Sequence, residues 1–210
     1  MKIIKKAFSI VLVLMLLFSL GVSANAAEKK EDKYVSAGQI KKEIETLYKK
    51  YNTQCDIIEF NQNVKYTGDE VDLELQKLEE SLASYEYFID AGEADAKESM
   101  INWVYTKTYT TYANISNGAL GNATIELKCS GTIYDGTSTF TDISNISTRQ
   151  YGSAFNFVSW NQYKSGYNYL ENKKKADVWA EGTLVTEAYI LGQKIRTTLN
   201  HGIGMIIQAG

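Results

Sequence analysis

The fold of this chain is decided between residues 123 and 134, where the sequence reads ATIELKCSGTIY. Apolar or small residues occupy every second position of this stretch, and mostly polar residues lie between them. Side chains on a β-strand point alternately to opposite faces, so the pattern predicts a strand with one buried and one solvated face. The dipeptide Asp135-Gly136 suits a two-residue hairpin turn, because glycine adopts the positive φ that such a turn requires.

Similar alternation predicts further strands on both sides of this hairpin. They are expected at residues 103–116, 137–146, 154–163, 177–190 and 194–207, with short turns at residues 117–121 and 191–193. Consecutive strands joined by short turns pair in antiparallel fashion. The sequence therefore predicts an antiparallel β-sandwich or barrel of about six strands within residues 99–210.

Residues 27–98 have helical periodicity instead. Ser36 followed by Gln39 forms a capping-box pattern at the start of a helix that ends near Asn52. A second helix is expected to begin with Asp69 as its N-cap and to end before Gly92. Its apolar positions are spaced by three and four residues: Val71, Leu75, Leu78, Leu82, Tyr85 and Ile89. With a short strand at residues 54–60, the predicted class is α+β, with two N-terminal helices before the β domain.

The first 26 residues have the three regions of a secretory signal peptide. Lysines occupy positions 2, 5 and 6, an apolar run covers residues 7–20, and Ala24-Asn25-Ala26 forms a cleavage site. A retained membrane anchor is the alternative, but the run is shorter than the roughly 20 residues that span a bilayer. We expect cleavage, secretion from a Gram-positive bacterium, and no transmembrane segment in the mature protein.

The charge of the mature chain restricts its partners. The signal peptide removes three of 22 basic residues and none of 25 acidic ones, which leaves a net charge of −6. Nucleic-acid binding needs concentrated positive charge, so we expect no nucleic-acid partner.

Two cysteines, Cys55 and Cys129, are present. Export to an oxidising compartment would allow a disulfide between them, which would tie the helical region to the sheet. Two separate buried thiols are the alternative, and the sequence leaves both open.

Few residues point to catalysis. His201 is the single histidine, and a lone histidine near a strand end favours a structural role. One histidine and two distant cysteines cannot form a zinc site at motif spacing, and no phosphate-binding glycine loop occurs, so no metal or cofactor is predicted. The remaining enzymatic hypothesis is a glycan hydrolase that uses two carboxylates, with Glu126 and Glu181 as candidates.

Aromatic residues are the unusual feature, with 15 tyrosines and three tryptophans. Trp103, Tyr105 and Tyr109 are expected on one face of their strand, and Trp179 beside Asp177 and Glu181. Such residues suit contacts with sugars or proteins, because they combine a large apolar area with a polar group. These four aromatic residues form the candidate ligand-binding surface, and envelope carbohydrate or another extracellular protein is the expected partner. Core and sheet packing is the alternative role.

The segment from Asp177 to Leu184, with Asn200 to Ile203, resembles the close of small secreted β-rich proteins of Gram-positive bacteria. The resemblance covers about the last 110 residues, implies export and a β-sandwich, and carries over no catalytic residues. The predicted function is a non-enzymatic extracellular binding or interaction protein. A secreted pore-forming or antagonistic protein is the first alternative, because threonine-rich amphipathic strands also occur in membrane-inserting barrels.

Overall fold

The computed structural model describes residues 33–101 and 103–210. The predicted signal peptide, residues 1–26, lies outside the described residues. Residues 34–210 form one compact unit that contains both the helices and the strands. Its helices are α2 (Ala37–Lys50) and α3 (Gly68–Ala83), with 3-10 turns η1 (Gly118–Leu120) and η2 (Glu171–Lys173).

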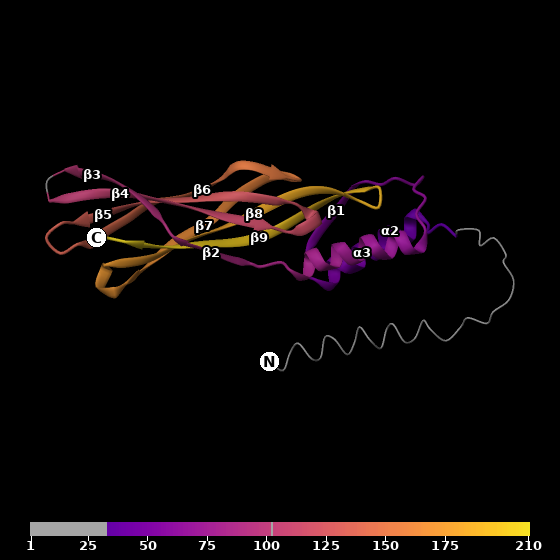
Figure 1. Ribbon diagram of the computed structural model, residues 1–210, viewed down its shortest axis with the longest axis horizontal. Coiled ribbons are helices and arrows are strands. Elements are labelled where there is room, and N and C mark those ends of the chain that lie inside the picture. The colour runs from indigo at the N-terminus through magenta and orange to yellow at the C-terminus, as the bar shows by residue number, and fades with distance from the viewer. Residues whose placement is uncertain (1–32, 102) are drawn as a thin grey trace, which may run out of the picture. The chain divides into compact units, whose positions relative to one another are not determined.

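Nine strands within the described residues form two sheets. One sheet has the order β1-β9-β8-β7, with β2 also paired to β9; the other has the order β3-β4-β5-β6. The bounds are β1 Gln54–Glu59, β2 Phe88–Glu93, β3 Asp95–Ile101, β4 Val104–Ser116, β5 Asn122–Tyr134, β6 Thr139–Phe155, β7 Phe157–Leu170, β8 Lys175–Ile190 and β9 Gln193–Gln208. Every pairing is antiparallel except that of β2 with β9. The predicted α+β class with antiparallel sheets is confirmed, but the number of strands is nine rather than about six (Figure 1).

The two sheets share one hydrophobic core. The alternating apolar residues of β5, among them Ile125, Leu127 and Ile133, pack in one cluster with Val178 and Leu184 of β8. The face of β5 that the sequence predicts to be buried is therefore the one turned towards the other sheet. The turn after β5 covers residues 135–138 rather than two residues, and the positive φ of 47° lies at Ser138.

The start of α2 is as the sequence predicts, whereas both ends of α3 differ from the prediction. Ser36 caps α2 as predicted, and its hydroxyl accepts a hydrogen bond from the Gln39 backbone N–H. The N-cap of α3 is Thr67 rather than Asp69, because Thr67 and Glu70 form a reciprocal capping box. The helix ends at Ala83, well before the predicted stop.

The end of the expected second helix is instead a strand. Residues 88–93 form β2, which lies parallel to β9 along residues 202–206. Pairing with β9 gives the backbone N–H and C=O groups of this segment the hydrogen bonds that a longer helix would have given them. The tertiary contact therefore outweighs the helical preference that the spacing of Tyr85 and Ile89 predicts.

A second cluster joins the helices to one end of the β1-β9-β8-β7 sheet. Ile40 and Ile44 of α2 and Leu78 of α3 pack with Ile190 and Ile195 of the sheet. The Tyr48 hydroxyl, also buried there, lies 2.7 Å from the Thr197 hydroxyl. The two helices lie side by side at this end of the strands (Figure 1).

The two cysteines are free thiols and lie in different clusters. Cys129 belongs to the core between the sheets, whereas Cys55 packs against the helix-covered cluster. The disulfide alternative is therefore not realised in the structure, since each thiol is directed into its own apolar environment. Burial raises the pKa of Cys129 to about 12, and burial, with Glu45 and Asp56, raises the pKa of Cys55 to about 11.

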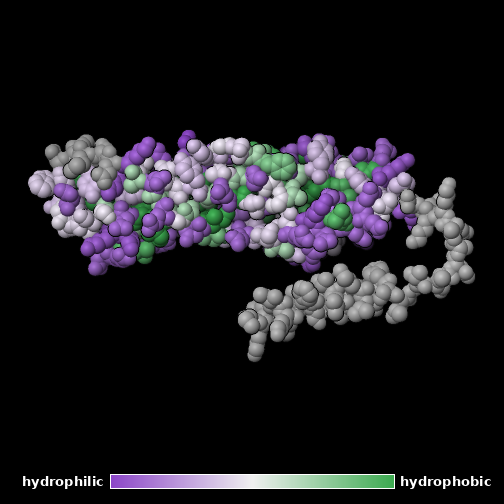
Figure 2. All heavy atoms as spheres, in the orientation of Figure 1, coloured by the Kyte–Doolittle hydropathy of each residue, from purple (hydrophilic) through white to green (hydrophobic). Residues whose placement is uncertain are grey.

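Within the described residues, no helix combines the length and the hydrophobicity needed to cross a bilayer. On the face drawn in Figure 2, hydrophobic residues are scattered among hydrophilic ones.

Candidate functional site

The structure does not bring the four predicted aromatic residues together. Tyr105 and Tyr109 of β4 are buried in the core, where their hydroxyls donate to the carbonyls of Ala209 at 3.1 Å and Gln208 at 2.6 Å. Trp103 is 73% exposed at the connection between β3 and β4. Trp179 lies half-buried on the other sheet. Only Trp103 and Trp179 are thus near solvent, and they lie on different sheets.

The backbone explains this separation. Trp103 has a φ of 56°, so it is a turn residue and does not continue the alternation of β4. The tyrosines share their face with Ala113 and Ile115, and this is the face turned to the core. β4 carries tyrosine and threonine on both faces, so its sequence does not reveal by itself which face is buried.

Trp179 belongs to a group of aromatic and charged residues on the outer face of the β7-β8-β9-β2 region. Strand register places Lys164 opposite Glu181, Glu181 opposite Gly202, and Gly202 opposite Phe88. The adjacent row on the same face runs from Gly166 through Trp179 and Gly204 to Asp90. We call this surface the aromatic platform and define it by Trp179, Phe88, Tyr87, Tyr163, Lys164 and Glu181.

Glycines make room for the platform rings. A Cβ atom at Gly202 or Gly204 would lie 2.6 Å from the Phe88 ring, so this ring occupies the space above both glycines. A Cβ atom at Gly166 would likewise lie 2.6 Å from the Trp179 ring. Phe88 is nevertheless 50% exposed, which leaves one side of the ring open to solvent. Glycine inside a strand weakens it unless another group packs there, and here the rings do so.

Charges lie directly beside these rings. The Lys164 ammonium lies 5.0 Å from the centre of the Trp179 ring and 3.7 Å from a Glu181 carboxylate oxygen. Partial desolvation, together with Glu181 and Tyr163, raises the pKa of Tyr87, so this phenol stays protonated at neutral pH. The platform therefore combines exposed ring surface with a hydroxyl donor, a carboxylate acceptor and an ammonium donor.

The two candidate catalytic carboxylates are far from forming a pair. Glu181 is on the outer face of one sheet and Glu126 on the outer face of the other, with the shared core between them. Glu126 is bound instead by Arg149, whose Nε and Nη2 donate to its two oxygens at 2.7 and 3.1 Å. The Arg149 guanidinium holds the pKa of Glu126 below its usual range, which favours a permanently ionised structural carboxylate.

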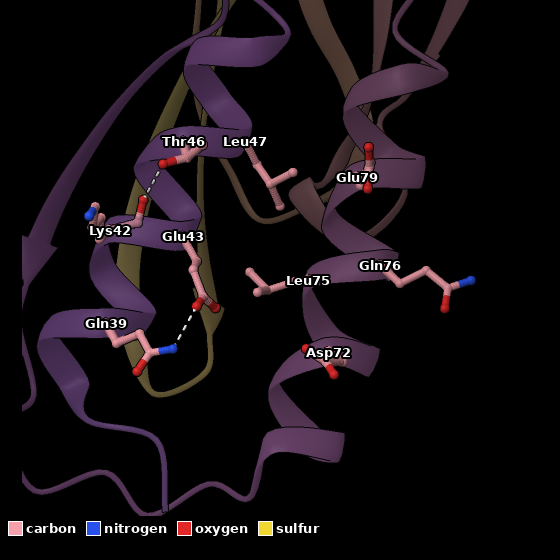
Figure 3. Close-up of a pocket in the computed structure, with 9 residues that line it drawn as sticks. All are labelled: Gln39, Lys42, Glu43, Thr46, Leu47, Asp72, Leu75, Gln76 and Glu79. Atoms are coloured by element: carbon pink, nitrogen blue, oxygen red, sulfur yellow. Dashed lines mark hydrogen bonds between the residues drawn. The ribbon is translucent and has the colours of Figure 1, made fainter. Parts of the chain in front are cut away.

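A groove of about 670 Å³ between α2 and α3 is a further concave surface. Leu47 and Leu75 point towards each other from the two helices, and polar side chains line the rest (Figure 3). Gln39 donates to Glu43 at 3.0 Å, and Glu79, also on the groove, accepts from Lys50 and Tyr51. Gln39, Glu43 and Glu79 are thus already bound within the protein, which favours the groove as the seam of two amphipathic helices.

Sequence reasoning missed Tyr87 and Phe88, because it placed residues 85–89 on a helix. Gly202 and Gly204 are the signal that could have found them, since alternate glycines in a strand indicate close approach of another group. Across the described ranges, no three His, Cys, Asp or Glu side chains are grouped so that they could hold a metal ion. Comparison of the chain with protein-family models, with curated proteins and with solved structures gives no match.

Proposed function

We propose that this chain is a secreted, non-enzymatic binding protein whose aromatic platform contacts envelope carbohydrate at the bacterial surface or in the medium. The predicted signal peptide supports an extracellular location. The net negative charge supports a partner other than nucleic acid.

The observation that carries the proposal is the position of Trp179 and Phe88 over a strip of sheet with glycines in place of side chains. The two rings fill the space above these glycines, and their solvent-facing sides suit a ligand with apolar C–H faces. Lys164 and Glu181 lie beside the rings and can bind hydroxyl groups.

A sugar fits this surface better than a protein partner does. Protein interfaces have an apolar centre depleted in charge, with polar groups at the rim. On the platform the charged pair Lys164–Glu181 lies next to Trp179, not outside an apolar centre. Alternation of ring and polar group over short distances matches the alternating C–H faces and hydroxyls of a polysaccharide.

Binding of the mature protein to purified wall polysaccharide tests the proposal. Trp179→Ala and Phe88→Ala are each expected to weaken retention about tenfold, the loss of one aromatic contact. Trp103→Ala is the matched control, because Trp103 is an exposed tryptophan outside the platform, and it should bind like the wild type. Equal loss in all three variants, or none in any, would contradict the proposal.

Three further outcomes would favour other functions. Binding to whole cell walls that is lost when the walls are treated with protease would indicate a protein ligand. Dye release from liposomes at nanomolar protein would support the pore-forming alternative. Glycan cleavage abolished by both Glu181→Gln and Glu126→Gln would support a hydrolase.

A further inference from the structure

A small cavity lies where β9 changes its edge partner. Pairing of β1 with β9 begins at Thr198, and pairing of β2 with β9 begins at Gly202, so His201 lies between the two partners. The cavity has a volume of about 220 Å³. It is lined by Ser84, Glu86, Ile89, Asn114, Ile115, Ser116, Asn117 and His201.

Two buried polar side chains of this cavity lack a hydrogen-bond partner. Asn117 is 2% exposed and His201 is 1% exposed, and neither Asn117 Nδ2 nor His201 Nε2 is bonded within the described residues. Buried polar groups are rarely left unpaired, because each costs about 1–3 kcal/mol. Each of the two atoms exposes less than 1 Å², so a ligand that supplies both partners displaces the side chains that cover them.

The surrounding contacts define what each group requires. His201 Nδ1 lies 3.1 Å from the Glu86 carbonyl oxygen, which can only accept, so Nδ1 carries the proton. Nε2 is then an acceptor and needs a donor. Asn117 Nδ2 is a donor and needs an acceptor. The Asn117 backbone is held beside the cavity by hydrogen bonds with Gly121 and Leu120.

We propose that this cavity binds the acetamido group of an N-acetylated amino sugar. The amide N–H donates to His201 Nε2, the amide oxygen accepts from Asn117 Nδ2, and the methyl group packs against Ile89 and Ile115. The need for one donor and one acceptor follows from the cavity alone, whereas the choice of an amide carried by a sugar rests on the proposed function.

Size and charge favour this group over other occupants. The cavity is several times larger than the ~30 Å³ that one water molecule occupies in the liquid. Glu86 is the lining residue that carries a formal charge, and its carboxylate disfavours an anionic ligand. Ser84, Glu86, Asn114 and Ser116 are exposed, so the sugar ring attached to the amide has access from solvent.

Titration of ¹⁵N-labelled mature protein at pH 7, followed by NMR, tests this proposal. N-acetylglucosamine and acetamide are expected to shift the Asn117 side-chain NH₂ signals and the His201 Nε2 resonance. Glucose, which lacks the amide, is expected to leave both unchanged. Trp179→Ala should respond to N-acetylglucosamine like the wild type, so failure of the platform and failure of the cavity give different results.

His201→Phe keeps a ring of similar shape and removes the acceptor, so affinity for N-acetylglucosamine should fall at least tenfold. If that variant does not fold, the wild-type titration decides. Absence of a shift with either amide overturns the proposal, as does an equal response to glucose, which would indicate a hydroxyl or water site. A response to acetamide but not to N-acetylglucosamine overturns the amino sugar as carrier.

Discussion

His201 is the residue whose chemistry is changed most by its surroundings. Burial lowers its pKa from 6.5 to about 4, although the hydrogen bond with the Glu86 carbonyl acts in the opposite direction. The imidazole is therefore neutral in the folded protein over most of the accessible pH range. Its neutral form is what makes Nε2 a hydrogen-bond acceptor.

This shift predicts acid sensitivity. Between pH 6.5 and about 4 the unfolded chain binds a proton at His201 and the folded chain does not, so stability falls as the pH falls. We expect His201 to account for a loss of roughly 2 kcal/mol between pH 6.5 and 4.5, with carboxylates beginning to titrate at the acid end of this range. Urea unfolding at several pH values measures it. His201→Phe should flatten this part of the profile, and an unchanged slope in that variant would contradict the assignment.

The Glu126–Arg149 pair supports a second prediction at the residue scale. Removing the guanidinium with Arg149→Ala leaves a mostly buried carboxylate without its two charged hydrogen bonds. We expect a lower urea midpoint at pH 7, with the loss moderated because the Arg149 side chain is 70% exposed. Arg196→Ala, which removes an arginine from the more exposed Glu187, should cost less. A larger loss for Arg196→Ala would contradict this ranking.

At the scale of elements, β9 and α3 show how contacts decide where a segment begins and ends. One edge of β9 pairs with β1 and then with β2, and the transition leaves the cavity beside His201. The first turn of α3 is fixed by hydrogen bonds between Thr67 and Glu70, with Thr67 N–H donating to the Glu70 carboxylate at 2.8 Å. Both features depend on a few specific groups, so single substitutions can test them.

Thr67→Ala should destabilise the protein by about 1 kcal/mol, because the Thr67 hydroxyl no longer caps the Glu70 backbone N–H. Asp69→Ala removes a first-turn carboxylate, and its loss should be no more than about 0.5 kcal/mol. Thermal unfolding of the two variants beside the wild type checks the order. A larger effect at Asp69 would show that this residue is the true N-cap.

At the scale of the whole molecule, two hydrophobic clusters divide the interior. One fills the space between the sheets, and the other lies between the helices and the end of one sheet. Each contains or contacts one cysteine, so the stability of the fold rests on packing rather than on a covalent link.

The mature protein should therefore carry two thiols when purified without reductant. Alkylation after denaturation is expected to add two groups by mass spectrometry, and reductant should leave the melting temperature unchanged. In the native state the reaction of Cys129 with thiol reagents should be very slow, because burial raises its pKa to about 12 and shields the sulfur. A mass two daltons below that of the dithiol would show instead that the bridge forms.

The strand alternation, the capped first helix and the α+β class could be predicted from the sequence, because they depend on residues within a few positions of one another. The strand at residues 88–93 could not be predicted in this way, because it forms by pairing with residues more than 100 positions away. The same holds for the platform and for the cavity. Trp179, Phe88 and Lys164 come from three different strands, and Asn117, which follows β4, lines the same cavity as His201 of β9. A one-dimensional pattern shows which side chains share a strand face, but strand register and sheet packing decide which faces meet.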